Sequence, residues 1–186
     1  DGRECLASVE CFKLRKRRWN ALPPMLEKRS YAVGARIRGS FYVCGGLDYP
    51  TYLSSAERLD LRARAWEPLP PMSGRRGSAA GAAVGTHVYV CGGRDAEKLL
   101  DSAERLPCGE DGRAASWEAL PRLLEPRSLA VAAAVDGKIF VLGGFDGRRH
   151  LASMEFFNED FSRWDAVPES MPVQRFSAAA VVMEHI

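Results

Sequence analysis

The sequence lacks the long apolar segment that a membrane span requires. Its longest purely apolar run is the heptapeptide Leu129–Val135, whereas a helix that crosses a bilayer needs about 20 apolar residues. The sequence also has little net charge, because 26 Lys and Arg offset 24 Asp and Glu to leave +2. A charge this small gives no global reason to expect an anionic partner. We therefore expect neither a membrane nor a nucleic acid among the partners.

Paired cysteines and clustered histidines are missing as well. The five cysteines form no C-x-x-C pair, so neither a disulfide framework nor a zinc knuckle is indicated. Cys44 and Cys91 stand in identical V-C-G-G contexts, which predicts twin buried thiols in a reducing setting, the cytoplasm or alternatively the nucleus. No histidine has a partner at metal-ligand spacing, and no nucleophile elbow or phosphate-binding loop occurs. The sequence therefore predicts no metal, no cofactor and no enzyme activity.

A repeat of about 47 residues runs through the whole chain. Its markers are a double glycine, an L-x-S-x-E pattern, a tryptophan and an arginine, always in this order. The tryptophans are 47, 51 and 47 residues apart, and four extra residues around Cys108–Gly112 explain the longer spacing. The marker positions are Gly45-Gly46, Gly92-Gly93 and Gly143-Gly144; Glu10, Glu57, Glu104 and Glu155; Trp19, Trp66, Trp117 and Trp164; and Arg29, Arg76, Arg127 and Arg175.

Each period contains four predicted strands. Apolar runs such as 128–135 and 139–142 flank a tight turn, which predicts a hairpin buried on both faces. The double glycine ends the second strand, where a residue without Cβ permits a close approach of backbone. The L-x-S-x-E stretch alternates with period two and predicts a third strand. A fourth strand carries the tryptophan and ends at proline. No helix signal interrupts this order, so each unit is expected to be a four-stranded antiparallel sheet.

This pattern resembles the kelch repeat. The double glycine, the aromatic residue two places before Cys44 or Cys91, the later tryptophan and the arginine all match it over essentially the whole chain. The third copy departs from the pattern, with Phe140 in place of the tyrosine and Leu142 in place of the cysteine. Neither a WD-type nor a sialidase-type blade motif is present. The resemblance implies an all-β fold, a β-propeller of four-stranded antiparallel blades.

The register of the markers predicts a partial ring. Asp1-Gly2-Arg3 aligns with Asp146-Gly147-Arg148, so residues 1–186 begin just after a double glycine. Kelch rings usually have six or seven blades, and we expect about three complete blades with half-blades at each end. Open blade faces would favour self-association of such a fragment. The predicted segments are outer strands at 5–21, blades at 29–68, 76–119 and 127–166, and the inner strand of a further blade at 175–183.

The repeated markers are expected to be structural. One tryptophan per blade at a fixed place predicts a packing residue rather than a ligand cage. The recurring Arg and Glu predict pairs that tie strands or blades together rather than an acid–base site. The basic run Lys13–Arg18 aligns with residues 61–65, the turn before Trp66, which predicts a surface loop of an outer hairpin. A localisation signal or a nucleic-acid patch is the alternative interpretation of this run.

The resemblance also implies where partners bind. In kelch modules of ubiquitin-ligase adaptors, partner peptides meet residues just after the repeat arginine and in the turn after the double glycine. Carried to this chain, the first set is Ser30, Ser128 and Phe176, and the copy with Gly77 lacks the small hydroxyl. The second set is Leu47, which replaces the usual aromatic, with Tyr49, Tyr52, Arg94, Lys98, Phe145, Arg148, Arg149 and His150. Arginines beside aromatics and hydroxyls are typical of surfaces that recognise acidic or phosphorylated peptides.

The resemblance therefore implies a noncatalytic protein–protein interaction module. Its expected setting is the substrate-recognition end of a BTB–kelch adaptor for a cullin-RING E3 ubiquitin ligase, whose machinery would be a partner where the full-length protein has a BTB region. Two alternatives stay open. One is a cytoskeletal or scaffolding kelch protein, and the other is a galactose-oxidase-like propeller enzyme with its catalytic residues on blades outside this sequence.

Overall fold

The structure is a computed structural model that describes residues 4–109, 114 and 116–183. Its regular elements in these residues are strands and one short 3₁₀ turn, η1 (Leu14–Lys16). In chain order the strands are β1 (Val9–Lys13), β2 (Arg18–Leu22), β3 (Val33–Ile37), β4 (Ser40–Cys44), β5 (Leu47–Asp48), β6 (Thr51–Tyr52), β7 (Ala56–Asp60), β8 (Ala65–Leu69), β9 (Ala80–Val84), β10 (His87–Cys91), β11 (Ala103–Pro107), β12 (Glu118–Leu120), β13 (Val131–Val135), β14 (Lys138–Leu142), β15 (Met154–Asn158) and β16 (Arg163–Ala166).

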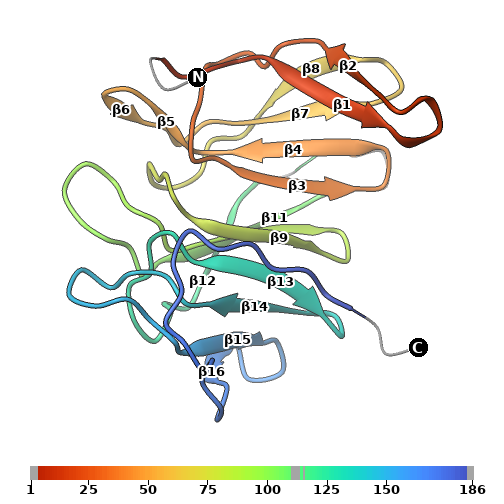
Figure 1. Ribbon diagram of the computed structural model, residues 1–186. Coiled ribbons are helices and arrows are strands. Elements are labelled where there is room, and N and C mark those ends of the chain that lie inside the picture. Colours follow the sequence, from red (N-terminus) through yellow and green to blue (C-terminus); the bar gives the residue numbers. More distant parts are fainter. Residues whose placement is uncertain (1–3, 110–113, 115, 184–186) are drawn as a thin grey trace.

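Three four-stranded antiparallel sheets follow one another along the chain. Their strand orders are β3–β4–β7–β8, β9–β10–β11–β12 and β13–β14–β15–β16, and a two-stranded sheet, β1–β2, precedes them. The first strands β3, β9 and β13 lie side by side, so the sheets stack like blades around a common axis (Figure 1). The protein is thus a partial β-propeller, and the predicted fold class is confirmed.

The prediction of a strand in the last segment is wrong. Residues 175–183 were expected to form an inner strand, but no strand is present between Ala166 and residue 183. A strand exists only where a ladder partner accepts and donates its backbone hydrogen bonds. The second strand of this hairpin would have to follow residue 183, beyond the described residues. The segment instead makes single backbone contacts, such as the Ser177 N–H bond to the Leu129 carbonyl at 2.9 Å.

Strand β10 shows why the inner strands are apolar on both faces. Val88 and Val90 point into the core shared with the preceding four-stranded sheet. Tyr89 and Cys91 alternate with them and point into the core shared with the following sheet. Because successive side chains of a strand point to opposite faces, a blade between two other blades buries both. The expected two-sided burial is present in this blade.

The double glycines bring successive sheets into backbone contact. A Cβ on Gly92 would lie 2.4 Å from the carbonyl oxygen of Arg127, and the first glycines of the other two pairs meet the next repeat's arginine at the same distance. The N–H of Gly93 donates to that same Arg127 carbonyl at 2.7 Å. All six glycines have positive φ. No other residue type fits both the conformation and the space.

The tryptophans after the first one also link successive sheets. Each donates its indole N–H to the carbonyl of a proline that follows the last strand of the preceding sheet. The pairs are Trp66 with Pro23 at 2.8 Å, Trp117 with Pro70 at 2.8 Å and Trp164 with Pro121 at 2.9 Å. Trp19 has no such acceptor among the described residues and is 65% exposed. The tryptophans therefore act as packing residues between blades, in the role expected from their spacing.

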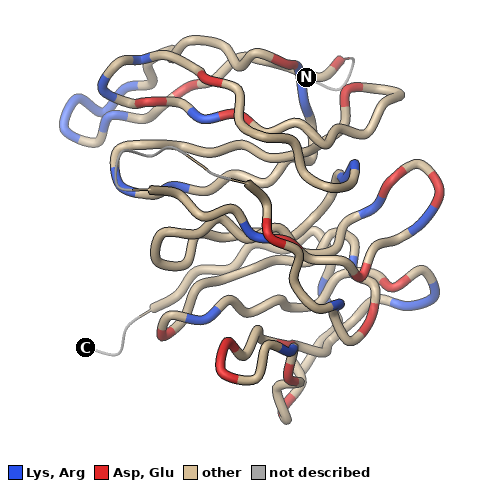
Figure 2. Tube along the Cα trace, turned by 180° about the vertical axis from the view of Figure 1, so that it is seen from behind, with Lys and Arg blue, Asp and Glu red and all other residues tan. Residues whose placement is uncertain are grey.

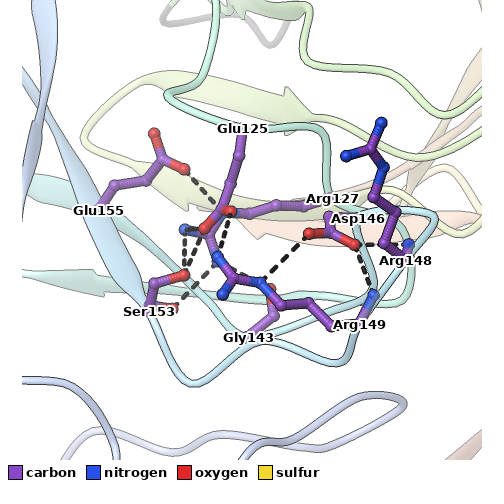
Figure 3. A network of polar contacts seen from close by, with 8 residues as sticks. All are labelled: Glu125, Arg127, Gly143, Asp146, Arg148, Arg149, Ser153 and Glu155. Atoms are coloured by element: carbon purple, nitrogen blue, oxygen red, sulfur yellow. Dashed lines mark hydrogen bonds and ion pairs between the residues drawn. The ribbon is translucent and has the colours of Figure 1, made fainter.

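A buried arginine precedes each of the three four-stranded sheets, and Figure 3 shows the network around Arg127. The guanidinium of Arg127 donates to Glu155 at 2.6 Å, to the Gly143 carbonyl at 2.9 Å and to the carbonyl and hydroxyl of Ser153. Glu155 in turn accepts the backbone N–H of Leu124 at 2.8 Å. The same pairing recurs for Arg29 with Glu57 and for Arg76 with Glu104, both at 2.7 Å. Each network ties the segment before the sheet to the end of its second strand and the start of its third.

Glycine-to-alanine substitutions test the backbone contact between sheets. Gly92→Ala should lower the free energy of unfolding by at least about 3 kcal/mol, because the new methyl group overlaps the Arg127 carbonyl. Gly85→Ala is the matched control: Gly85 also has positive φ but a Cβ there meets nothing within 4 Å, so only the conformational cost of about 1–2 kcal/mol remains. Urea unfolding measures both values. Equal losses would contradict the proposed steric role of the pair.

Removing one partner of a buried ion pair tests the arginine networks. Glu104→Gln leaves the guanidinium of Arg76 buried without its counter-charge, which should cost about 3 kcal/mol or more. Glu4→Gln is the control, because the ion pair of Glu4 with Lys28 is exposed on both sides and its loss should change the free energy of unfolding far less. The comparison uses the same urea titration. The assignment fails if Glu104→Gln is as mild as the control.

Candidate functional site

Two kinds of segment meet at one end of the sheets: the turns after the repeat arginines and the loops after the double glycines (Figure 1). In each repeat a short antiparallel bridge joins the residue after the arginine to the residue after the glycine pair. The bridged pairs are Ser30 with Leu47, Gly77 with Arg94 and Ser128 with Phe145. The two sets of candidate residues, which are far apart in the sequence, are therefore neighbours in space.

A chain of backbone hydrogen bonds runs from repeat to repeat along this end. Ser78 N–H donates to the Tyr31 carbonyl, Leu129 N–H to the Ser78 carbonyl and Ser177 N–H to the Leu129 carbonyl, at 2.8–3.0 Å. All four residues have φ between 48° and 57°. Sequence reasoning missed these residues, although each stands two places after a repeat arginine. The repeat alignment contains that signal, but Tyr, Ser and Leu are not residue types that favour a left-handed backbone.

A groove of about 560 Å³ lies between these turns and loops, and we call it the rim groove. Six of the predicted partner-binding residues line it, together with the four left-handed residues. Its walls combine aromatic and aliphatic side chains with two cations, and the Arg94 guanidinium lies 5.9 Å from the centre of the Tyr52 ring. The predicted residues that the groove brings together are Leu47, Tyr52, Arg94, Lys98, Ser128 and Phe145.

The loop that carries Arg94 and Lys98 is ordered by its own aspartate. Asp95 Oδ1 accepts the backbone N–H of Glu97 and of Lys98, both at 2.8 Å. Partial burial opposes ionisation of Asp95, but these N–H groups prevail and lower its pKa. These bonds fix the backbone that carries Arg94 and Lys98.

Arg148 and Arg149 lie outside the rim groove. Asp146 Oδ1 accepts their backbone N–H groups, both at 2.7 Å, which lowers the pKa of Asp146. The Arg149 guanidinium approaches Asp146 at 3.5 Å and Glu125 at 3.9 Å, while Arg148 points away from this network (Figure 3). Arg149 lines a smaller hollow of about 200 Å³ instead. The turn has the same aspartate-to-backbone bonds as the Asp95 loop, but neither of its two arginines lines the rim groove.

The remaining candidates occupy three separate positions. His150 stacks on Phe176 with ring centres 4.1 Å apart and lies 5.4 Å from the Phe145 ring. The Ser30 hydroxyl donates to the Leu47 carbonyl at 3.1 Å, so it supports the groove wall from behind. Tyr49 is 83% exposed between β5 and β6 and lines no described pocket.

Potential metal ligands are scattered among the described residues, and two of the thiols are deeply buried. No three His, Cys, Asp or Glu side chains among them lie close enough to hold a metal ion. Burial raises the pKa of Cys44 to about 12 and also raises the pKa of Cys91, so both thiols stay protonated near neutral pH. In the same residues no helix has the length and apolar character to cross a membrane.

Comparison with known proteins identifies the repeat. Residues 28–73, 75–110 and 126–171 match the family of the Kelch motif, and these segments cover more than half of the chain. Human Kelch-like protein 33 is 35% identical over 68 residues. That match spans 37% of this chain but only 13% of the relative, so most of the relative's length has no counterpart in it.

Proposed function

The chain belongs to the kelch-repeat family, and from that premise we propose that it is a noncatalytic module that binds a protein partner in the rim groove. Kelch repeats are protein-interaction repeats, and the likeness to a Kelch-like protein agrees with this class. The observation that carries the proposal is the rim groove itself, because residues from successive repeats line one hollow on a rigid backbone.

The lining of the rim groove favours an extended peptide with acidic or phosphorylated side chains. Arg94 and Lys98 supply charged donors, which suit carboxylate and phosphate oxygens. Tyr31, Tyr52 and Phe145 supply broad apolar walls, where an aromatic or aliphatic anchor could bury its side chain. Glu97, on the same loop, would repel a peptide whose acidic groups extend over it, so it selects the position of the charge.

The wider setting follows the family resemblance. We place the module at the substrate-recognition end of a BTB–kelch adaptor for a cullin-RING E3 ubiquitin ligase, acting in the cytoplasm. The supporting observation is the likeness to a protein named Kelch-like protein 33. A scaffolding role remains the second candidate function, because hairpin turns at the opposite end of the sheets are also exposed.

Binding to a peptide array tests the rim groove. The 186-residue chain should retain acidic or phosphorylated peptides and not their amide-substituted counterparts. Arg94→Gln combined with Lys98→Gln should weaken the best peptide at least about tenfold, because two charge-assisted hydrogen bonds are lost. Fluorescence anisotropy gives both dissociation constants.

Arg148→Gln combined with Arg149→Gln is the charge-matched control, since these side chains lie next to the rim groove but do not line it. This control should change the affinity less than about twofold. Equal weakening by the two double variants, or no preference for acidic peptides, would contradict the assignment of the rim groove.

A further inference from the structure

The turn between β1 and β2 concentrates positive charge at an exposed hairpin tip. Five of the six residues from Lys13 to Arg18 are Lys or Arg. The tip is a 3₁₀ turn, Leu14–Lys16, followed by Arg17 in a left-handed conformation. Within the described part of the chain none of these five cations has an ion-pair partner. Their charge is therefore available to a partner.

Two neighbouring turns extend this charge. The additional cations are Arg36 near the end of β3, Arg38 in the β3–β4 turn, and Arg62 and Arg64 in the β7–β8 turn. Arg64 reaches the preceding sheet, where its guanidinium donates to the Ala21 carbonyl at 3.3 Å. In both views these turns gather at the end of the sheets opposite the rim groove (Figures 1 and 2). We call these nine cations the basic end: Lys13, Arg15, Lys16, Arg17, Arg18, Arg36, Arg38, Arg62 and Arg64.

The five cations of the first turn are not neutralised by ion pairs within the described residues. Asp60 is the acidic residue of these turns, and its Oδ1 accepts the backbone N–H groups of Arg62 and Ala63, both at 2.8 Å. The corresponding β15–β16 turn of the last sheet carries Glu159 and Asp160 instead. The net charge of +2 therefore averages over turns of opposite sign at the same end of different sheets. An argument from total charge does not apply to a surface that is locally this cationic.

Leucines stand among these cations. Leu14 is 80% exposed at the centre of the first turn, and Leu61, at the equivalent place of the β7–β8 turn, is 38% exposed. Lys and Arg alone do not identify the partner, because they bond base edges and nucleic-acid phosphates as readily as lipid headgroups. Cations that surround an exposed aliphatic side chain are instead the combination that binds the interface of an anionic bilayer.

We propose that the basic end docks on an anionic lipid surface, with Leu14 entering the headgroup layer and the surrounding Lys and Arg facing lipid phosphates and carboxylates. Each Lys or Arg close to such a surface strengthens binding roughly fivefold. The rim groove, at the opposite end of the strands, stays open to its own partner. The two interactions are therefore independent.

Sedimentation with lipid vesicles tests the proposal on the 186-residue chain. Vesicles of phosphatidylcholine with about one third phosphatidylserine should bind the protein, and pure phosphatidylcholine vesicles should not. Arg15→Gln combined with Lys16→Gln should lower the partition coefficient roughly twenty-fivefold. Leu14→Gln should lower it without any change of net charge, which reports insertion rather than attraction alone. Near-UV circular dichroism checks that each variant is folded.

The matched control removes two cations from the other end of the sheets. Arg75→Gln combined with Arg122→Gln makes the same change of net charge and should leave vesicle binding unchanged. Equal losses in the two double variants, or no binding to the anionic vesicles, would overturn the proposal. So would binding of a 20-nucleotide RNA with the same dependence on Arg15 and Lys16 in the absence of vesicle binding, which would assign the basic end to nucleic acid.

Discussion

The close approach of the first glycine of each pair to the next repeat's arginine carbonyl determines how the sheets are arranged. At 2.4 Å from the position of an added Cβ, this contact leaves no room for a side chain. It fixes the spacing between successive sheets at the end where the loops emerge. The buried guanidinium of Arg127 then holds the carbonyl of Gly143, so the charge network and the backbone contact reinforce each other. Loop positions follow from these contacts.

The fold was predictable because its determinants are periodic. A double glycine, an indole donor and an Arg–Glu pair each satisfy the same geometric need once per blade, so their spacing in the sequence reports the spacing of blades. The periodic markers could not predict whether a strand forms at 175–183, because a strand needs a partner segment for its ladder whatever its own composition. The composition of that segment is typical of an inner strand, yet no ladder forms within the described residues.

The candidate site was predictable in part. The family pattern locates the loops, and Arg94, Lys98 and Tyr52 do line one groove. It does not report side-chain direction, so Arg148 and Arg149 were grouped with residues that face a different hollow. It also does not report local charge: the run Lys13–Arg18 is a hairpin tip, as expected, but the basic β3–β4 and β7–β8 turns lie at the same end of the sheets. Neither effect is visible along a linear chain.

The left-handed backbone at Tyr31 and Leu129 has an evolutionary consequence. Side chains other than glycine are disfavoured there by about 1 kcal/mol or more, yet both residues are large. Because main-chain hydrogen bonds link these positions, their side chains can change while the backbone links stay. Single substitutions at Tyr31 or Leu129 can therefore change what the rim groove binds. Glycine or asparagine there would relieve the backbone strain but would give up part of the groove wall.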